Sequence, residues 1–297
     1  MKPLLFPPVA SPYLVPWNRR FRIGDAPTEP PEDAPGKKKL AARLERAVAR
    51  MAAAQEKLYA DDRYSLLLVF QAMDAAGKDG TIKAVTTGLN PTGCQVFSFK
   101  APSAEELDHD FMWRIHRALP ERGRIGIFNR SYYEEVLVVR VHPELLDLQR
   151  LPNRPKKLGQ IWEERYDSIR DVERHLARNG TAILKFFLNV SRGEQKKRFL
   201  DRIEEQKANW KFSAKDVAER AHWDDYMEAY EQALGATSRP WAPWFAIPAD
   251  SKAFMRTMVA EIVAETLESL PLRFPVVPRE EKKRMAELRA KLEGGEL

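Results

Sequence analysis

The sequence has few of the residues that several common classes of protein require. Its 297 residues include one cysteine, Cys94. One cysteine excludes an intrachain disulfide framework and a structural zinc site built from several cysteines. The five histidines show no metal-ligand spacing. The longest apolar run, near residues 66–70, is far too short to cross a bilayer, so we expect no membrane partner.

An uninterrupted apolar leader is also absent from the first residues. The segment MKPLLFPPVASPYLVPWNRR is broken by prolines, unlike a secretory signal, so we expect a cytoplasmic protein. Proline stays frequent through residues 1–36 and forbids a regular helix there. We expect an extended N-terminal arm that packs on the body through Phe6, Tyr13 and Trp17.

Charge, by contrast, is abundant and its excess is positive. Charged residues make up 31% of the chain, and the net charge is +6. A basic protein favours an anionic partner such as a nucleotide, polyphosphate, nucleic acid or an acidic surface. Many soluble proteins carry this charge by chance, so charge alone leaves these possibilities open.

Short apolar runs alternate with helical patterns along most of the chain. Apolar runs without strict alternation are typical of parallel strands buried on both faces, and they occur at residues 65–70, 95–99, 124–128, 182–188 and 244–247. Helical patterns occur at residues 37–59, 81–89, 104–118, 131–139, 157–179, 191–234, 251–270 and 280–293. The alternation predicts an α/β fold, a three-layer α/β/α sandwich around a parallel sheet.

Residues 71–83 (QAMDAAGKDGTIK) form the segment best suited to bind phosphate. They connect an apolar strand to a helix that starts near Lys78, which is the context of a P-loop. Backbone N–H groups of small residues can form an anion cradle there, and the helix amino terminus adds a positive dipole end. The phosphate-binding candidates of this loop are Ala75, Ala76, Gly77, Lys78, Asp79, Gly80 and Thr81.

The loop departs from the standard pattern G-x-x-x-x-G-K-[ST] at two positions. Ala72 replaces the first glycine, and Asp79 replaces the Ser or Thr whose hydroxyl usually binds magnesium. Asp74 offers a carboxylate instead, and an acid beside a phosphate repels it unless a cation lies between them. We therefore assign Asp74 as a ligand of Mg²⁺. The alternative is that Asp74 or Asp79 only caps a helix or lies in its first turn.

A second motif, NRSYYEEVLVVRV at residues 129–141, follows the apolar run at 124–128. Ligands bind beyond the carboxyl ends of parallel strands, so Asn129 and Arg130 should reach the rim of the phosphate loop. The planar guanidinium of Arg130 is suited to clamp a phosphate. Glu134 and Glu135 come one turn later and, with Arg140, are candidates for the nucleotide side of the site.

Six segments, in this order and spacing, resemble the polyphosphate kinase type 2 family. They are FQAMDAAGKDGTIKAV, FNRSYYEEVLVVRVHPE, ILKFFLNVSRGEQKKRF, WKFSAKD, WDDYMEAYEQAL and WAPWFAIPADSK, which begin at residues 70, 128, 183, 210, 223 and 241. The resemblance covers about residues 37–270. It implies a P-loop kinase core of five parallel strands with helices on both sides and a helical lid.

The resemblance also implies an activity. Family members transfer a phosphoryl group between inorganic polyphosphate and a nucleotide (AMP/ADP to ADP/ATP) with Mg²⁺, and they form homo-oligomers. Asp74 and Lys78 match the family's Walker A acid and lysine. The Walker B position is commonly aspartate followed by arginine, whereas this chain has Asn129 and Arg130. This departure resembles the subgroup that phosphorylates AMP as well as ADP.

Residues 185–215 carry nine basic and four acidic side chains. On a helix, residues four apart share a face. A basic helix that closes over a phosphate chain would neutralise its charge, whereas a solvated charged face is the alternative. The candidate polyphosphate contacts are Arg198, Arg202, Lys207 and Lys211. We expect an arm at 1–36, a kinase domain at 37–270 with a lid at about 191–222, and a helical tail at 271–297.

Two other functions use the same features. An ATP-dependent nucleotide or small-molecule kinase would have the same loop, and a non-enzymatic binder of nucleic acid or other polyanions would have the same charge. The basic lid and Asp79 favour polyphosphate as the donor. Asp74 inside the cradle argues against a pure polyanion binder, so we expect no nucleic-acid partner.

Overall fold

The centre of the molecule is a five-stranded, fully parallel sheet with the strand order β2-β3-β1-β4-β5. The structure is a computed structural model that describes residues 6–152, 154–206 and 209–295. The strands are β1 (Ser65–Gln71), β2 (Cys94–Ser98), β3 (Ile125–Asn129), β4 (Thr181–Asn189) and β5 (Trp244–Pro248). The predicted α/β fold is confirmed, and each predicted strand is present with bounds that differ by one residue.

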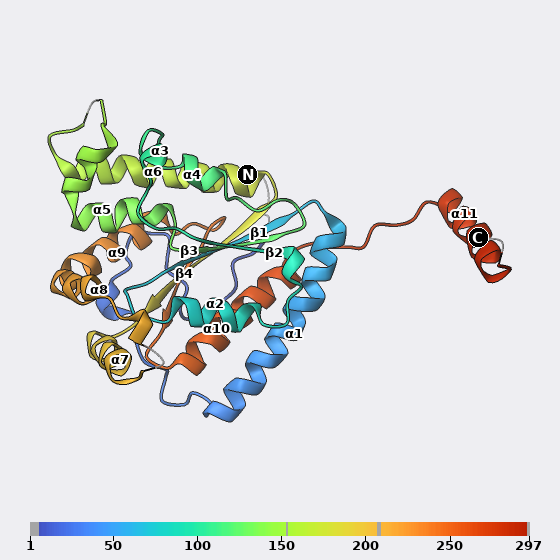
Figure 1. Cartoon of the computed structure of the whole chain (residues 1–297), viewed down its shortest axis with the longest axis horizontal. Coiled ribbons are helices and arrows are strands. Elements are labelled where there is room, and N and C mark those ends of the chain that lie inside the picture. The colour runs from blue at the N-terminus through green and yellow to red at the C-terminus, as the bar shows by residue number, and fades with distance from the viewer. Residues whose placement is uncertain (1–5, 153, 207–208, 296–297) are drawn as a thin grey trace.

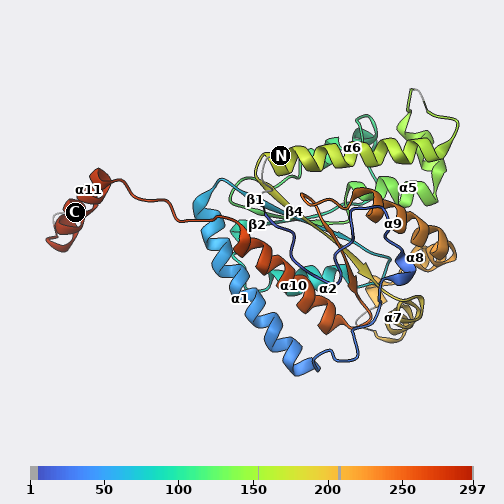
Figure 2. The same ribbon diagram turned by 180° about the vertical axis from the view of Figure 1, so that it is seen from behind.

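Helices cover both faces of the sheet (Figures 1 and 2). One face carries α1 (Lys37–Asp61), α2 (Lys78–Thr86) and α10 (Lys252–Ser269), and the other carries α5 (Val138–Val141), α6 (Leu158–Arg178) and α9 (Trp223–Thr237). Stacked rings of Phe70, Phe186 and Phe245 link β1, β4 and β5, with centroids 5.2 and 5.8 Å apart. Every residue of β1 and β4 is buried, as expected for parallel strands between two helical layers.

Three predicted helical regions are interrupted. Residues 104–118 form only α3 (Ala104–Leu107) and α4 (Trp113–His116), because the Asp110 carboxylate accepts the Met112 amide in between. Residues 131–139 begin as a 3₁₀ helix (Tyr132–Val136) that Ser131 caps. Residues 191–234 divide into α7 (Arg192–Glu204), a short 3₁₀ turn, α8 (Ala214–Ala218), a second 3₁₀ turn and α9.

The amino-terminal segment packs along the outer edge of β5. The Val15 amide donates to the Trp244 carbonyl at 2.9 Å, and the Ala246 amide donates to the Tyr13 carbonyl at 2.8 Å. Phe6 and Tyr13 are buried as predicted, but Trp17 is 44% exposed, so its predicted packing role is wrong. The segment supplies partners to an edge strand that would otherwise present unpaired backbone groups.

The carboxyl-terminal segment leaves the body after α10. It ends in α11 (Arg279–Glu293), which stands apart from the rest of the molecule (Figures 1 and 2). All described residues of α11 are exposed. Within the described residues, no helix combines the length and apolar character that a membrane span needs.

Candidate active site

The phosphate loop lies between the end of β1 and the first turn of α2. Two of its residues have left-handed backbone conformations, Ala75 with φ 61° and Gly77 with φ 107°. A left-handed alanine costs about 1–2 kcal/mol, and such strain persists mainly at functional sites. Alternation of right- and left-handed residues directs successive N–H groups toward one point, which is how backbone binds an anion.

Helix α7 holds the carbonyl groups of this loop. The Arg198 guanidinium donates from Nη1 to the carbonyls of Ala76 at 2.6 Å and Ala75 at 3.2 Å. Gln195 Nε2 donates to the Asp74 carbonyl at 2.9 Å. These bonds hold the carbonyl groups of the loop against α7.

Arg198, predicted as a polyphosphate contact of the lid, lines the cleft above the loop and also braces the loop. It is only 4% exposed, and its Nη2 donates to the Ala249 carbonyl at 2.7 Å while its Nε donates to Glu194 at 2.9 Å. It joins α7, the phosphate loop and the turn after β5. No local pattern indicates this bracing role, since the carbonyl partners of Arg198 lie about 50 and 120 residues away.

Lys78 and Arg130 meet at the rim of the sheet. Lys78 Nζ donates to the Ala72 carbonyl at 2.7 Å. Burial and then the charge of Arg130 lower the pKa of Lys78, although the nearby acids Asp74, Glu134 and Asp79 oppose this shift. Arg130 adopts a left-handed conformation with φ 63°, and its Nη2 lies 2.9 Å from Asp74 Oδ1. Glu134 and Asp74 raise the pKa of Arg130, so both cations face the same acids.

The predicted catalytic residues are thus close together in the structure. Asn129 Nδ2 donates to Asp79 Oδ1 at 2.7 Å, which explains how an aspartate is accommodated at the position of the usual hydroxyl. Glu134 Oε1 accepts a hydrogen bond from Gln71 at 3.0 Å, and Glu134 Oε2 lies 3.6 Å from Arg130 Nη1. The carboxyl ends of β1 and β3 lie side by side, so residues 55 positions apart in sequence share one rim.

A cleft of about 950 Å³ opens above the phosphate loop. Eight basic and five acidic residues line it among the described residues. The basic ones are Lys78, Lys100, Arg130, Arg198, Arg202, Lys215, Lys252 and Arg256. The lining also includes six of the seven predicted loop residues, from Ala75 to Gly80. An extended polyanion fits such a surface better than a compact neutral ligand does.

Sequence reasoning missed three cations of this cleft, Lys100 after β2 and the pair Lys252 and Arg256 after β5. Arg256 Nε is buried, and in the described part of the chain it has no hydrogen-bond partner. Gly80 makes room for this side chain, because a Cβ at that position would lie 2.8 Å from Arg256 Nη2. Lys252 and Arg256 begin the helix that follows β5. The same carboxyl-end rule that located Asn129 and Arg130 would have found them.

A second cavity, of about 580 Å³, adjoins the cleft and shares Asp74 and Arg130 with it. Its wall combines Glu134 and the tyrosines of α9, Tyr226 and Tyr230, with several apolar side chains. The apolar residues include Leu137, Val138, Leu145 and Leu148. A mixed wall of this kind suits a small molecule with a ring and an anionic end.

Three predicted contacts are engaged elsewhere. The Thr81 hydroxyl is buried and donates to the Gly77 carbonyl at 3.0 Å. Glu135 forms a buried ion pair with Arg165 at 3.1 Å, although it also lines the second cavity described above. Arg140 donates to the Tyr166 hydroxyl at 3.1 Å and is not among the described residues that line either cavity.

Of the remaining lid candidates, Arg202 is the one whose side chain the structure describes. Arg202 lines the cleft, with its Nη1 3.9 Å from Asp216 Oδ2. Lys207 lies outside the described residues. Lys211 ends a 3₁₀ turn, and its side chain is also outside the described part.

The donor set at Asp74 suits a metal that arrives with phosphate. The described residues contain no group of three His, Cys, Asp or Glu side chains able to enclose an ion. Mg²⁺ usually keeps several waters and binds one or two carboxylates plus substrate phosphates. Asp74, partly exposed and beside the phosphate loop, matches that requirement.

Comparison with known proteins agrees with this geometry. The profile of the family described as Polyphosphate kinase 2 (PPK2) matches residues 35–273. The chain belongs to this family, which confirms the resemblance seen in the sequence. Its P-loop kinase fold is the fold of the solved PPK2 structures. The crystal structure of polyphosphate kinase 2 from Arthrobacter aurescens is 37% identical, with a TM-score of 0.81 over 94% of this chain and 100% of that chain.

Curated PPK2 relatives cover most of the chain. An ADP-polyphosphate phosphotransferase from Rhodopseudomonas palustris is 51% identical over 283 residues, which are 93% of this chain and 98% of the relative. An AMP/ADP-polyphosphate phosphotransferase from Meiothermus ruber is 45% identical over 226 residues, which are 76% of this chain and 80% of the relative.

Proposed function

We propose that this PPK2 protein transfers a phosphoryl group between inorganic polyphosphate and a nucleoside mono- or diphosphate. The observation that carries the proposal is the junction of two cavities at Asp74 and Arg130, directly beside the phosphate loop. One cavity is a long basic cleft and the other is a smaller, partly apolar one. The relatives named for ADP and AMP/ADP acceptors support the same assignment.

In this proposal, polyphosphate occupies the basic cleft, and its terminal phosphate lies on the loop amides. Lys78 and Arg130 stabilise the negative charge on the group in transfer. The nucleotide occupies the second cavity, with its phosphate toward Arg130. The attacking phosphate oxygen is already anionic, so neither a general base nor a covalent protein intermediate is required, and positioning provides most of the catalysis.

We assign Mg²⁺ as the cofactor, held by Asp74 together with phosphate oxygens. When bound, it would neutralise charge on the transferred group. Loss of even an outer-shell partner of a metal ligand weakens metal binding by about 10–100-fold, so Asp74→Asn should raise the Mg²⁺ concentration for half-maximal rate by at least that order. Asp79→Asn is the matched control, because Asp79 already accepts Asn129, and an equal shift in both variants would contradict the assignment.

The acceptor in this proposal follows from the resemblance of Asn129 and Arg130 to the subgroup that phosphorylates AMP as well as ADP. The relative named for AMP and ADP supports it. We therefore propose AMP as well as ADP. A coupled luminescence assay with ADP or AMP, with and without polyphosphate, tests the function. Product that depends on polyphosphate supports it, whereas product only with an ATP donor, or salt-dependent binding without turnover, contradicts it.

The domain organisation and the cellular setting complete the proposal. Residues 37–270 act as the kinase domain and about 191–222 as its lid, with 1–36 and 271–297 as arm and tail. Because Gln195 and Arg198 fasten the start of α7 to the phosphate loop, any closing motion would begin after Arg198. We also propose that the protein is cytoplasmic and forms a homo-oligomer. Light scattering of the purified protein would test its oligomeric state.

A further inference from the structure

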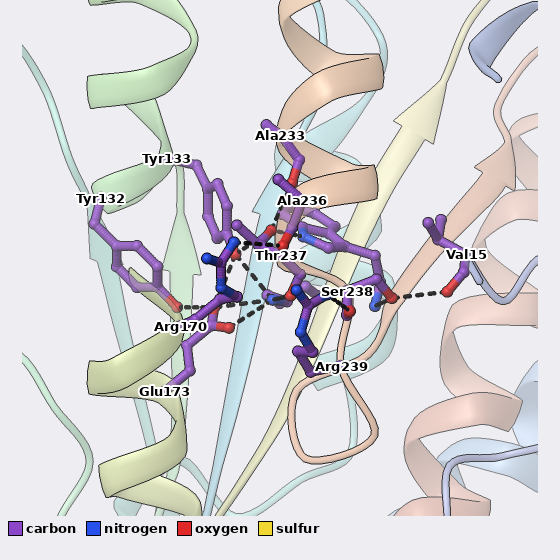
Figure 3. A network of polar contacts seen from close by, with 12 residues as sticks. Val15, Tyr132, Tyr133, Arg170, Glu173, Ala233, Ala236, Thr237, Ser238 and Arg239 are labelled. Atoms are coloured by element: carbon purple, nitrogen blue, oxygen red, sulfur yellow. Dashed lines mark hydrogen bonds and ion pairs between the residues drawn. The ribbon is translucent and has the colours of Figure 1, made fainter. Parts of the chain in front are cut away.

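A lysine occupies the middle of β4, a strand in which all residues are buried. Lys185 is fully buried, and its Nζ lies 2.7 Å from Glu173 Oε2 on α6. The same ammonium donates to the Tyr133 hydroxyl at 2.8 Å and to the Thr237 carbonyl, at the end of α9, at 2.9 Å. Figure 3 shows the partners Glu173, Tyr133 and Thr237 converging between the sheet and the helices.

Two consecutive tyrosines join this ion pair. The hydroxyls of Tyr132 and Tyr133 each lie 2.9 Å from Glu173 Oε1, and Tyr133 also bonds Thr237 Oγ1 at 2.9 Å (Figure 3). The Tyr133 ring packs edge-on against Trp244 of β5. The network therefore fastens the start of the 3₁₀ segment to α6, β4, β5 and α9 at once.

Stability alone does not account for this arrangement. Removing two charges from water is costly, and a buried ion pair can often be replaced by apolar residues of similar size with no loss of stability. What such a pair provides is a defined geometry, because each partner is restricted to the few positions where its hydrogen bonds are satisfied.

The geometry that is fixed here belongs to the reaction site. Tyr132 and Tyr133 lie in sequence between Arg130 and Glu134, both of which line the junction of the two cavities. Arg130 has a left-handed backbone, a strained conformation that persists only where the surrounding structure holds it. Among the described residues that line the cleft and the second cavity, Lys185, Glu173 and the two tyrosines do not appear.

We propose that Lys185 and Glu173 are positioning residues that hold Tyr132 and Tyr133 and thereby set Arg130 and Glu134 against the nucleotide. The inference rests on the proposed function for the identity of the reaction. Charged groups near Lys185 are Glu173 and Arg170 on α6 and Arg239 after α9, and the neutral hydroxyl of Tyr133 on the 3₁₀ segment contacts it as well. Burial lowers the pKa of Lys185 to about 8, so this network can titrate within an accessible range.

The test replaces the pair by apolar residues of similar size, Lys185→Met with Glu173→Leu. We expect the urea midpoint to fall, because the Tyr132 hydroxyl and the Thr237 carbonyl lose their buried partners, so kcat is measured without urea at a temperature where the variant is folded. We also expect kcat to fall about tenfold or more, since small misplacements of site residues have effects of that order. The KM for polyphosphate should change less than kcat does, because Arg130 is one of eight cations that line the basic cleft.

A matched control removes a different ion pair, Arg43→Met with Glu261→Leu, which links α1 to α10 at 2.6 Å on the opposite face of the sheet. It should leave kcat unchanged. Tyr132→Phe with Tyr133→Phe provides an independent variant that keeps both rings, and it should lower kcat in the same direction if the first variant does not fold.

Wild-type kcat in either variant of the network would overturn the inference. So would an equal loss of kcat in the control, because the effect would then be a general one of lost ion pairs. The wild-type protein in the same assay separates the two hypotheses. If it shows no polyphosphate-dependent transfer, the proposed function fails, whereas an active wild type with unchanged variants refutes only the positioning role.

Discussion

The assignment of Arg198 as a brace for the phosphate loop can be tested by its removal. Arg198→Met keeps most of the aliphatic stem but removes the guanidinium, which bonds four backbone carbonyls and Glu194. Two of those carbonyl bonds are short, at 2.6 and 2.7 Å, and lie in a buried setting. An unsatisfied buried acceptor costs about 1–3 kcal/mol, so we expect the free energy of unfolding to fall by about 3–5 kcal/mol.

The assay is urea unfolding followed by tryptophan fluorescence, together with steady-state kinetics. Two neighbours on α7 serve as controls. Lys197 is 71% exposed and lies 4.0 Å from Glu194, so Lys197→Met should change stability by less than about 0.5 kcal/mol. Arg202 lines the cleft, so Arg202→Met should mainly raise the KM for polyphosphate, and more so at low salt.

A bracing arginine and a donor-binding arginine on α7 change different quantities when they are removed. If Arg198→Met unfolds like the wild type and only raises the KM for polyphosphate, Arg198 binds the donor directly and the bracing argument is wrong. A combined loss of stability and kcat, absent from Lys197→Met, is the result that the structure predicts.

Two further predictions follow from the loop and from the buried pair. Gly77→Ala should destabilise the protein by about 1–2 kcal/mol and weaken polyphosphate binding, because φ of Gly77 is 107° and the new Cβ would lie 3.2 Å from Met255. Gly159→Ala is the control. A Cβ there meets nothing within 4 Å, so this variant should be neutral in urea unfolding and kinetics. In a pH–rate profile, kcat should fall as pH rises through about 8, where Lys185 becomes neutral, and the Lys185→Met, Glu173→Leu variant should lack this limb. The pKa of Lys185 is lower in the folded protein than its ordinary value of 10.5. The contribution of Lys185 to the free energy of unfolding therefore rises between about pH 8 and 10.5. Loss of stability through this group cannot explain the fall in kcat. An unchanged limb in the variant would assign it to another group.

The strands of the sheet were predicted well because each one is recognised from a short stretch of sequence. Each strand is a short apolar run bounded by helical patterns, and burial on both faces requires that composition. The interrupted helices were missed for the opposite reason. At residues 104–118 the apolar spacing continues, but the side chain of Asp110 satisfies a backbone amide and ends the regular structure.

The candidate site shows the same division. Residues 74–80 were predicted because the loop is contiguous and its composition follows from close approach of phosphate to backbone. The structural contacts of Glu135 and Arg198 were not predictable, because their partners come from other elements. Glu135 pairs with Arg165, and Arg198 donates to the carbonyls of Ala75 and Ala249. A basic residue in a basic segment is equally compatible with a ligand contact and a structural one.

The most direct test of the central claim is a phosphorus NMR time course with polyphosphate, Mg²⁺ and ADP or AMP, run on the wild type and on Lys78→Met. Lys78 supplies a mobile cation at the loop, and loss of one stabilising group at a transferring centre costs about 3–4 kcal/mol, or about 10²–10³ in kcat. The wild type should convert polyphosphate and nucleotide into the next higher nucleotide, and Lys78→Met should be slower by that factor while remaining folded. Near-wild-type turnover in Lys78→Met, or no polyphosphate-dependent product from the wild type, would contradict the account.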